Sequence, residues 1–334
     1  MTSRSLKLLW SKIGKGDGVG NGKERHKMIT REKFLEPEIR DGVEVSAEMK
    51  AAWKVLLDML EEFIRICEKY DLKYCLDGGT MLGAIRHKGF VPWDDDVDVS
   101  LPRADFQRFL EIAKNELKPP HFLQYGTTDP EHFKAFACIR NNQTSGIDML
   151  WVCEGRRYNM GIGMDIFPFD DVPEKAADLK GLLWRNKQFI RVFRHALSHN
   201  LKGWRKWITH PCFLLLYKLI GNDRLVKWRD RNFAAYTDTN ATRYGNIAYQ
   251  LGNERGIFRK EVFKDRIKVP FEYIEAYVPG GYEEYLSHLY GVNWRTPIRD
   301  AGDHGALIMD AKQPYKKLLV ERFGYKKEWV ENLP

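Results

Sequence analysis

Hydrophobic residues recur every three or four positions in the chain after Ser46. Residues at this spacing share one face of an α-helix, and Ser46 is a suitable N-cap because its hydroxyl oxygen accepts a hydrogen bond from a free backbone N–H. The pattern predicts an amphipathic helix whose apolar face packs into the core. The residues on that face are Met49, Trp53, Leu56, Leu57, Leu60, Ile64 and Cys67.

Shorter apolar segments follow this helix and predict a mixed α+β fold. Residues 73–77 have the pattern of a short strand, and a glycine turn leads from them into a second helix that runs through Ile85. Pro102 and Arg103 introduce a third helix, with apolar residues at Phe106, Phe109, Leu110 and Ala113. Further strands are expected at residues 121–125, 135–140, 147–152 and 163–168, and their spacing suggests a mixed sheet.

Four aspartates occupy the five positions from 94 to 98. Asp96-Val97-Asp98-Val99 alternates as a β-strand does, so Asp96 and Asp98 are expected on one face, with the valines in the core. Neighbouring carboxylates repel one another unless a positive charge lies among them, and such oxygen ligands suit Mg²⁺ or Mn²⁺. Asp94 shares the face of Asp96 if the strand begins early, whereas Asp95 is expected to face away. The alternative is an acidic surface turn.

Asp165 lies inside the otherwise apolar segment 163–168. Burying an unpaired carboxylate costs several kcal/mol, so Asp165 needs a partner. A metal ion shared with Asp96 and Asp98 is one such partner. A carboxylate that caps a turn at the end of the strand is the alternative.

The turn before the second helix contains Gly78, Gly79 and Thr80. Glycines allow close approach of a ligand, and the free amides at the start of a helix favour phosphate. Arg86 and His87 follow at the end of this helix, where they either balance the charge of a phosphate or complement the helix C-terminus.

Residues 76–100 resemble the signature of the LicD family of phosphocholine transferases. This segment contains the glycine turn, the basic residues Arg86 and His87, and the aspartates. Fukutin and fukutin-related protein belong to the same wider group. The resemblance extends from Lys73 to His304, apart from much of 172–245. Other segments that resemble the family are 137–144, 164–169, 260–263, 269–271 and 281–286. The chain departs from the family pattern at Arg259, where proline is usual, and at Val262, where tryptophan is common.

The resemblance implies a nucleotidyltransferase-like mixed β-sheet flanked by helices. In such a fold a glycine turn, a strand with alternating carboxylates and a third carboxylate on a neighbouring strand hold metal and nucleotide. Here it implies a catalytic and metal site at Asp96, Asp98 and Asp165, with Asp94 as a second candidate. The implied substrate-binding residues are Gly78, Gly79, Thr80, Arg86, His87, Arg140 and His304.

Composition and charge limit the class of protein. The 334 residues are 43% hydrophobic, enough for one large domain or two smaller ones, and the net charge of +8 favours a polyanionic partner. Five scattered cysteines without a CxxC pair argue against a disulfide framework and against a cysteine-type zinc site. We expect neither a secretion signal nor a membrane-spanning helix.

Positive charge is concentrated between Arg185 and Arg231, where the acids are Asp223 and Asp230. Tryptophans and the short apolar run 212–217 lie among the cations, a composition typical of a helix in an anionic membrane interface. A helical hairpin that covers the core with solvated arginines is the alternative, and nucleic-acid binding ranks third because no known module is present. His195 and His199 are spaced as zinc ligands on a helix, but no HExxH glutamate accompanies them, so a zinc site is not expected.

These patterns divide the chain into four parts. Residues 1–45 form a basic segment and flexible linker, 46–171 a nucleotidyltransferase-like core, 172–245 a basic, aromatic helical insertion, and 246–334 the C-terminal part of the catalytic domain. The expected location is cytoplasmic, peripheral on the inner face of the membrane.

The resemblance implies a transferase that moves phosphocholine, or a similar phospho-alcohol, from a CDP-activated donor such as CDP-choline to a hydroxyl. The acceptor it implies is a cell-surface glycan, such as a lipopolysaccharide, teichoic acid or capsule, or a lipid-linked precursor. Two alternatives stay open: a nucleotidyltransferase that releases pyrophosphate from a nucleoside triphosphate, and a non-catalytic adaptor at the membrane surface.

Overall fold

The computed structural model describes residues 29–200, 203, 205–237, 239–248, 254–298 and 307–334. Residues 1–28 of the predicted N-terminal segment and linker, and His304, lie outside the described residues.

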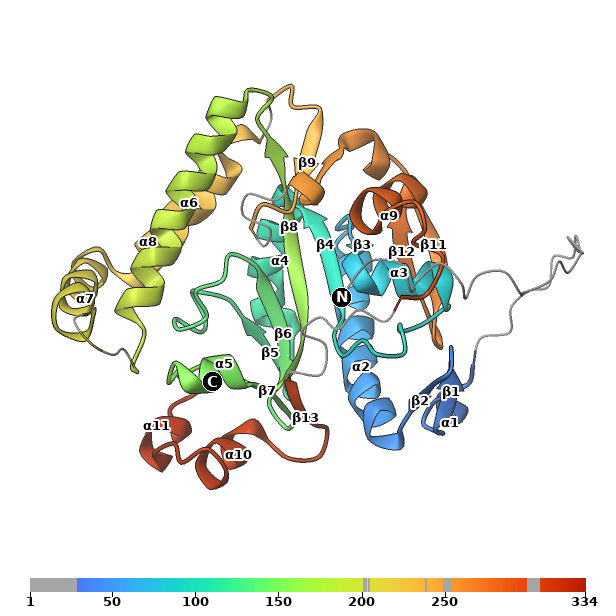
Figure 1. The fold of residues 1–334 in the computed structure, drawn as a ribbon, viewed down its shortest axis with the longest axis horizontal. Helices are drawn as coiled ribbons and strands as arrows, with labels where there is room; N and C mark the ends of the chain where they lie inside the picture. The colour runs from blue at the N-terminus through green and yellow to red at the C-terminus, as the bar shows by residue number, and fades with distance from the viewer. Residues whose placement is uncertain (1–28, 201–202, 204, 238, 249–253, 299–306) are drawn as a thin grey trace, which may run out of the picture.

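A seven-stranded mixed sheet forms the centre of the molecule (Figure 1). Its longest strand, β8 (Ile162–Val172), pairs in parallel with β4 (Asp98–Pro102) and antiparallel with β6 and β9. The mixed sheet that the strand spacing predicted is therefore confirmed. Its other strands are β3 (Cys75–Leu76), β5 (His121–Gln124), β6 (Ala137–Asn141), β9 (Arg243–Gly245) and β10 (Ile257–Arg259).

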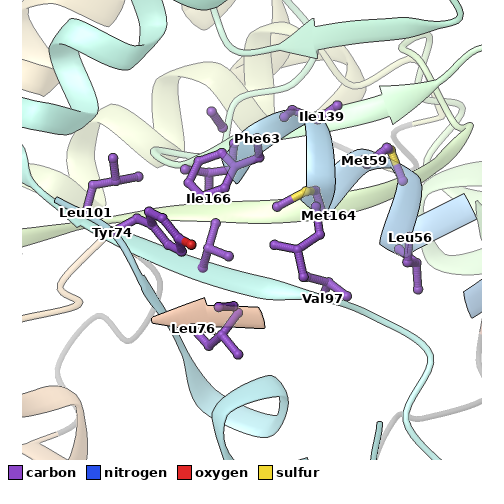
Figure 2. Close-up of a cluster of buried hydrophobic side chains, with 14 of the residues drawn as sticks. Leu56, Met59, Phe63, Tyr74, Leu76, Val97, Leu101, Ile139, Met164 and Ile166 are labelled. Atoms are coloured by element: carbon purple, nitrogen blue, oxygen red, sulfur yellow. The ribbon is translucent and has the colours of Figure 1, made fainter. Parts of the chain in front are cut away.

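The helix α2 (Ala47–Lys69) packs on one face of this sheet and contacts β6 and β8. Its N-cap is Ser46, as predicted, and the Ser46 side chain accepts a hydrogen bond from the Met49 amide at 3.3 Å. Figure 2 shows side chains of α2 meeting those of the sheet. The residues labelled there include Leu56, Met59 and Phe63 from the helix, and Leu76, Val97, Leu101, Ile139, Met164 and Ile166 from the strands and the approach to β4.

The helix α4 (Arg103–Glu116) begins where β4 ends and packs against β4 and β8. Arg103 and Asp170 form a buried bidentate ion pair, with nitrogen to oxygen distances of 2.6 and 2.7 Å. A buried pair of this kind adds little net stability, but losing one partner leaves an uncompensated charge. The pair therefore fixes how α4 lies on β8.

Smaller elements surround the main sheet. The strand predicted at 147–152 is wrong in its second half: β7 ends at Asp148, whose side chain accepts a hydrogen bond from Leu150 N and starts α5 (Met149–Cys153). The paired strands are β1 (Glu38–Arg40) with β2 (Val43–Val45), β7 (Ser145–Asp148) with β13 (Leu307–Asp310), and β11 (Arg266–Phe271) with β12 (Ile274–Pro279). Other short helices are α1 (Arg31–Phe34), η2 (Ala234–Tyr236), η3 (Glu254–Gly256), η4 (Lys260–Phe263), α9 (Tyr282–Tyr290), α10 (Tyr315–Glu321) and α11 (Lys327–Glu331).

Helices between residues 176 and 233 form an arm to one side of the sheet (Figure 1). It consists of α6 (Ala176–Ala196), η1 (Arg205–Thr209), α7 (His210–Ile220) and α8 (Asn222–Phe233). Buried Arg229 ties α8 to the core, because its guanidinium donates to the carbonyl oxygens of Phe133 and Lys134 at 3.1 and 2.8 Å. Among the described residues, no helix combines the length and the apolar content needed to cross a bilayer.

Candidate active site

The glycine turn places the start of helix α3 (Gly78–Arg86) at the edge of the sheet. Asp77 is its N-cap, and Asp77 Oδ1 accepts hydrogen bonds from Gly78 N at 2.8 Å and from the Tyr285 hydroxyl. Gly78 has φ +48°, in the left-handed region that favours glycine. The sharp change of direction from β3 into α3 therefore depends on Gly78.

Both glycines also make room for acidic side chains. A Cβ atom on Gly79 would lie 2.6 Å from Asp94 Oδ2, and one on Gly78 would lie 3.3 Å from Asp98 Oδ2. The positive end of the α3 dipole favours carboxylates at this position. The missing side chains of the two glycines thus let two acids approach the start of α3.

Asp98 and Asp165 lie side by side on neighbouring strands. They are partners in the parallel register of β4 and β8, and Cys138 of β6 is the antiparallel partner of Asp165. The Cys138 thiol donates to Asp165 Oδ1 at 2.7 Å. The two strands predicted to carry the acids are therefore adjacent.

The alternation predicted around Asp98 holds, although β4 begins two residues later than expected. Val97 and Val99 are fully buried in the core, whereas Asp96 and Asp98 are half-buried. Asp96 precedes the strand, but the Val97 carbonyl oxygen already accepts a hydrogen bond from Asp165 N at 2.9 Å.

Asp94, Asp95 and Asp96 form a compact group of carboxylates. Each offers one oxygen atom such that all three oxygens lie within 4.8 Å of one another, and this is the one group of three potential metal ligands at that spacing among the described residues. The prediction that Asp95 faces away is therefore wrong. The reason is that these residues leave a turn, in which Asp94 N donates to Val91 O, so strand alternation does not apply to them. Trp53 holds this turn by donating from Nε1 to the Asp94 carbonyl oxygen at 2.9 Å.

Burial and mutual repulsion raise the pKa values of two acids in this cluster, Asp96 and Asp98. Burial raises the pKa of Asp96 well above its usual range, and Asp94, Asp95 and Asp165 raise it further. Burial likewise raises the pKa of Asp98, with Asp96, Asp165 and Asp77 adding to the effect. A divalent cation would relieve this repulsion, and carboxylate oxygens are the ligands that Mg²⁺ prefers. The residues present therefore fit such an ion.

A cavity of about 420 Å³ opens beside the acids, within the range of small-molecule sites. Gly79, Arg86 and Asp94 line it, so it joins the glycine turn to the aspartates. Arg86 donates to the Trp294 carbonyl oxygen at 2.9 Å, which fixes one wall. The remaining lining residues are Leu82, Val91, Trp93, Tyr290, Asn293, Trp294, Thr296 and Ile298.

Sequence reasoning missed the aromatic part of this lining. Trp93 directly precedes the aspartates, which was an available signal, whereas Tyr290 and Trp294 reach the site only through the fold. Trp294 Nε1 is buried and, within the part of the chain that the structure describes, has no hydrogen-bond partner. A buried donor without a partner is costly, so this N–H is suited to an acceptor atom of a ligand.

Three other residues that were predicted to bind substrate make contacts with neighbouring parts of the fold. Thr80 is buried, and its hydroxyl oxygen accepts a hydrogen bond from Asp98 N at 2.8 Å, which holds the start of β4 against α3. His87 Nε2 lies 2.6 Å from Asp41 Oδ2, and His87 does not line the cavity. Arg140 donates to Gln124 Oε1 and to the Gly161 carbonyl oxygen, at 2.8 and 3.0 Å.

Arg140 nevertheless lies close enough to the acids to interact with them. Burial opposes its charge, but Cys138 and Asp165 outweigh this effect and raise the pKa of Arg140. Arg140 crosses over Gly163, where a Cβ atom would lie 2.6 Å from Arg140 Cδ. Its role in the structure is to place a fixed positive charge near Asp165.

Comparisons with known proteins agree with this geometry. Residues 71–205 match the family described as LicD/FKTN/FKRP, nucleotidyltransferase domain. The lipopolysaccharide cholinephosphotransferase LicD of Haemophilus influenzae is 30% identical over 250 residues, which cover 73% of this chain and 90% of that protein. An uncharacterized protein of Rickettsia typhi is 34% identical over 71 residues, 21% of each chain.

The match to the Haemophilus protein covers nearly all of that protein, and the matched family segment contains the glycine turn, the aspartates and Asp165. The predicted fold, a nucleotidyltransferase-like mixed sheet flanked by helices, is confirmed by this match and by the observed sheet. The chain belongs to the LicD family of transferases.

Proposed function

We propose that this protein transfers phosphocholine, or a similar phospho-alcohol, from a CDP-activated donor to a hydroxyl of a cell-surface glycan or its lipid-linked precursor. The observation that carries the proposal is a cluster of acids that includes Asp94, Asp96, Asp98 and Asp165. Asp94 and Asp98 lie at the start of α3, and Asp94 lines a cavity of about 420 Å³. The similarity to the Haemophilus relative, a lipopolysaccharide cholinephosphotransferase, supports choline as the alcohol and a lipopolysaccharide as the acceptor.

Magnesium fits this role better than a softer metal, because the candidate ligands are all carboxylates. Asp94, Asp95, Asp96 and Asp98 would hold it, and manganese has the same ligand preference. When bound, the ion supplies positive charge that neutralises the diphosphate.

The reaction breaks one phosphoanhydride bond and forms one phosphodiester bond. The acceptor oxygen attacks the phosphorus that carries choline, CMP leaves, and the acceptor hydroxyl loses its proton. Asp165 accepts this proton in our proposal, because it lies beside Asp98 and is oriented by the Cys138 thiol. Arg86 and the amide end of α3 bind the diphosphate from the cavity side.

The proposed location follows from the acceptor. A lipid-linked glycan lies at a membrane, and CDP-alcohols are cytoplasmic metabolites, so we place the enzyme on the inner face of the cytoplasmic membrane. We propose that residues 46–171 and 246–334 together form the catalytic unit, with 172–245 as an insertion and 1–45 as a basic leading segment. Nucleic acid is not a partner in this proposal.

The test is to measure nucleotide products with purified protein and Mg²⁺. We expect CMP from CDP-choline, with less from CDP-ribitol and CDP-glycerol, in the presence of a lipopolysaccharide acceptor. Asp223→Asn, at an exposed acid on α8, is the matched control for substitutions in the acid cluster. Pyrophosphate release from CTP, without CMP from any donor, would instead identify a nucleotidyltransferase and overturn the proposal.

A further inference from the structure

Helix α7 carries an apolar face that the rest of the molecule leaves uncovered. None of its 11 residues is buried, and Figure 1 shows it at the outer edge of the arm, away from the central sheet. The exposed fractions of Leu215 and Leu219 are 60% and 72%. Residues at spacings of three and four share one side of a helix, so the exposed apolar residues form a continuous stripe. The outer stripe of α7 consists of Cys212, Leu215, Leu216 and Leu219.

The opposite side of α7 is the one that holds it to the arm. Phe213 stacks on His195 of α6 with ring centroids 5.1 Å apart, and Tyr217 meets Phe193 edge to face at 6.1 Å. His210 Nδ1 lies 2.7 Å from the His195 carbonyl oxygen. Folding of the arm therefore uses the inner side of α7, and the leucines of the outer stripe are not needed for it.

Exposed cations lie on the same arm as the outer stripe, and Lys218 is on α7 itself. Between residues 185 and 231 the acids are Asp223 and Asp230, and Asp230 already accepts a hydrogen bond from the Tyr125 hydroxyl. This leaves a strong excess of positive charge on the arm that carries the aliphatic stripe. The exposed cations of the three helices include Lys187, Arg191, Lys218, Arg224, Lys227 and Arg231.

We propose that the outer stripe of α7 inserts into the interfacial layer of an anionic membrane, while exposed cations of the arm meet the lipid phosphates. A leucine-rich face bordered by lysine and arginine is what interfacial helices present, and each such cation adds attraction to an anionic leaflet. Protein interfaces instead concentrate tyrosine, tryptophan and arginine at their centre. The buried Arg229 that anchors α8 makes the arm a rigid support for this insertion. The inference rests on the proposed function only for the purpose of membrane binding, which is to bring the enzyme to a lipid-linked acceptor.

Sedimentation with vesicles tests the surface directly. We expect the full chain to pellet with vesicles of phosphatidylethanolamine and phosphatidylglycerol, and much less with phosphatidylcholine alone. Leu215→Glu combined with Leu219→Glu should weaken binding by at least roughly tenfold, because it puts charge on the inserted side. Ile39→Glu is the matched control, since Ile39 is an equally exposed apolar residue on β1, and it should bind as the unchanged protein does.

A fluorophore can show which side of the arm enters the lipid. Cys153 and Cys212 are the exposed cysteines among the described residues, so an environment-sensitive dye can be attached to Cys212 in a Cys153→Ser chain, or to Cys153 in a Cys212→Ser chain. Anionic vesicles should shift the emission of the dye on Cys212 to the blue and leave that on Cys153 unchanged.

Three results would overturn the inference: no vesicle binding by the unchanged chain, equal binding by the double glutamate variant, or a dimer in solution that this variant dissociates. The last would show that a second copy covers the stripe. CMP release in solution without vesicles should be the same in the double variant and the control. Vesicle binding without CMP release from any CDP-alcohol would leave this inference standing and refute the proposed function.

Discussion

Asp98 contributes both backbone hydrogen bonds and a carboxylate to the site. Its amide donates to Thr80 Oγ1, its carbonyl oxygen accepts from Asp77 N, and its carboxylate lies near Asp96 and Asp165. The backbone bonds hold the carboxylate in place against the repulsion of the other acids. Holding these acids together costs folding free energy, and this cost can be measured as a dependence of stability on pH.

We expect the contribution of Asp96 and Asp98 to the stability of the metal-free protein to fall as the pH rises above about 4, the ordinary pKa of an aspartate. Burial and neighbouring acids raise the pKa of Asp96 and Asp98 in the folded state, so the folded protein binds these protons more tightly than the unfolded chain does. That contribution is fully present below the unfolded pKa and disappears as the pH rises through the folded pKa. The check is a series of thermal melts at increasing pH in EDTA.

Asp98→Asn should have opposite effects on stability and activity. At neutral pH in EDTA its melting temperature should exceed that of the unchanged protein, because one of the repelling charges is gone, while kcat should fall by roughly a thousandfold or more. Mg²⁺ should raise the melting temperature of the unchanged protein more than that of the variant. Equal kcat values for the variant and for Asp223→Asn would contradict the assignment of Asp98.

Trp294→Phe should weaken donor binding and leave the chemical step largely intact. The substitution keeps the aromatic ring but removes the buried Nε1–H, which has no partner among the described residues. We expect KM for the CDP-alcohol to rise by roughly tenfold, the effect of one lost hydrogen bond, with little change in kcat. Trp228→Phe, on the exposed side of α8, serves as the control, and an equal KM for both variants would show that Trp294 does not contact the donor.

At the scale of elements, the site forms where α3 begins beside the first residue of β4. The turn before β4 also meets the start of α3, and this second contact depends on glycine at position 79, because any side chain there would meet the carboxylate of Asp94.

Gly79→Ala should therefore lower activity more than stability. Its Cβ would lie 2.6 Å from Asp94 Oδ2, so the carboxylate must move by a few tenths of an ångström or more. Displacements of about 1 Å in a catalytic site cost on the order of a hundredfold in rate, so we expect a loss of kcat of about tenfold to a hundredfold. Gly181→Ala in α6 has room for its Cβ and should keep full activity; a similar loss in both variants would argue against the close contact at position 79.

Elements whose signal is local in the sequence were predicted well. Helix α2 and its Ser46 cap, α4, and the two strands with Asp98 and Asp165 follow from periodicity within a few residues. The strand prediction for the second half of 147–152 was wrong because its apolar residues suit both a strand and a helix, and Asp148 caps a helix there. The predicted orientation of Asp95 was wrong because this residue belongs to a turn.

The remaining parts of the site are long-range features that a local pattern does not encode. Tyr290 and Trp294 are about two hundred positions away from Gly79 and Asp94, and only the fold brings them to one cavity. His87 looked like a phosphate ligand from its place after α3, but Asp41 from the β1–β2 turn lies against it. Strand alternation and the family resemblance both indicated the three carboxylates, whereas the aromatic wall came from the structure.

At the scale of the whole molecule, the acid cluster and the outer stripe of α7 belong to different parts of one chain. The central sheet carries the acids, and the arm extends from the end of β8 and is fixed by Arg229. In the proposed function, the molecule therefore separates a site for a soluble, charged donor from a surface suited to lipid. Such a separation fits an enzyme that takes one substrate from solution and the other from a membrane.

The most direct test of this account is ³¹P NMR of the protein with CDP-choline, a lipopolysaccharide acceptor and Mg²⁺. The two diphosphate resonances of CDP-choline should give way to one resonance of CMP and one phosphodiester resonance on the acceptor, and both products should be absent in EDTA and with Asp98→Asn. Unchanged diphosphate resonances in the complete mixture, or equal conversion by Asp98→Asn, would contradict the central claim that these carboxylates form a metal-dependent site for transfer from a CDP-alcohol.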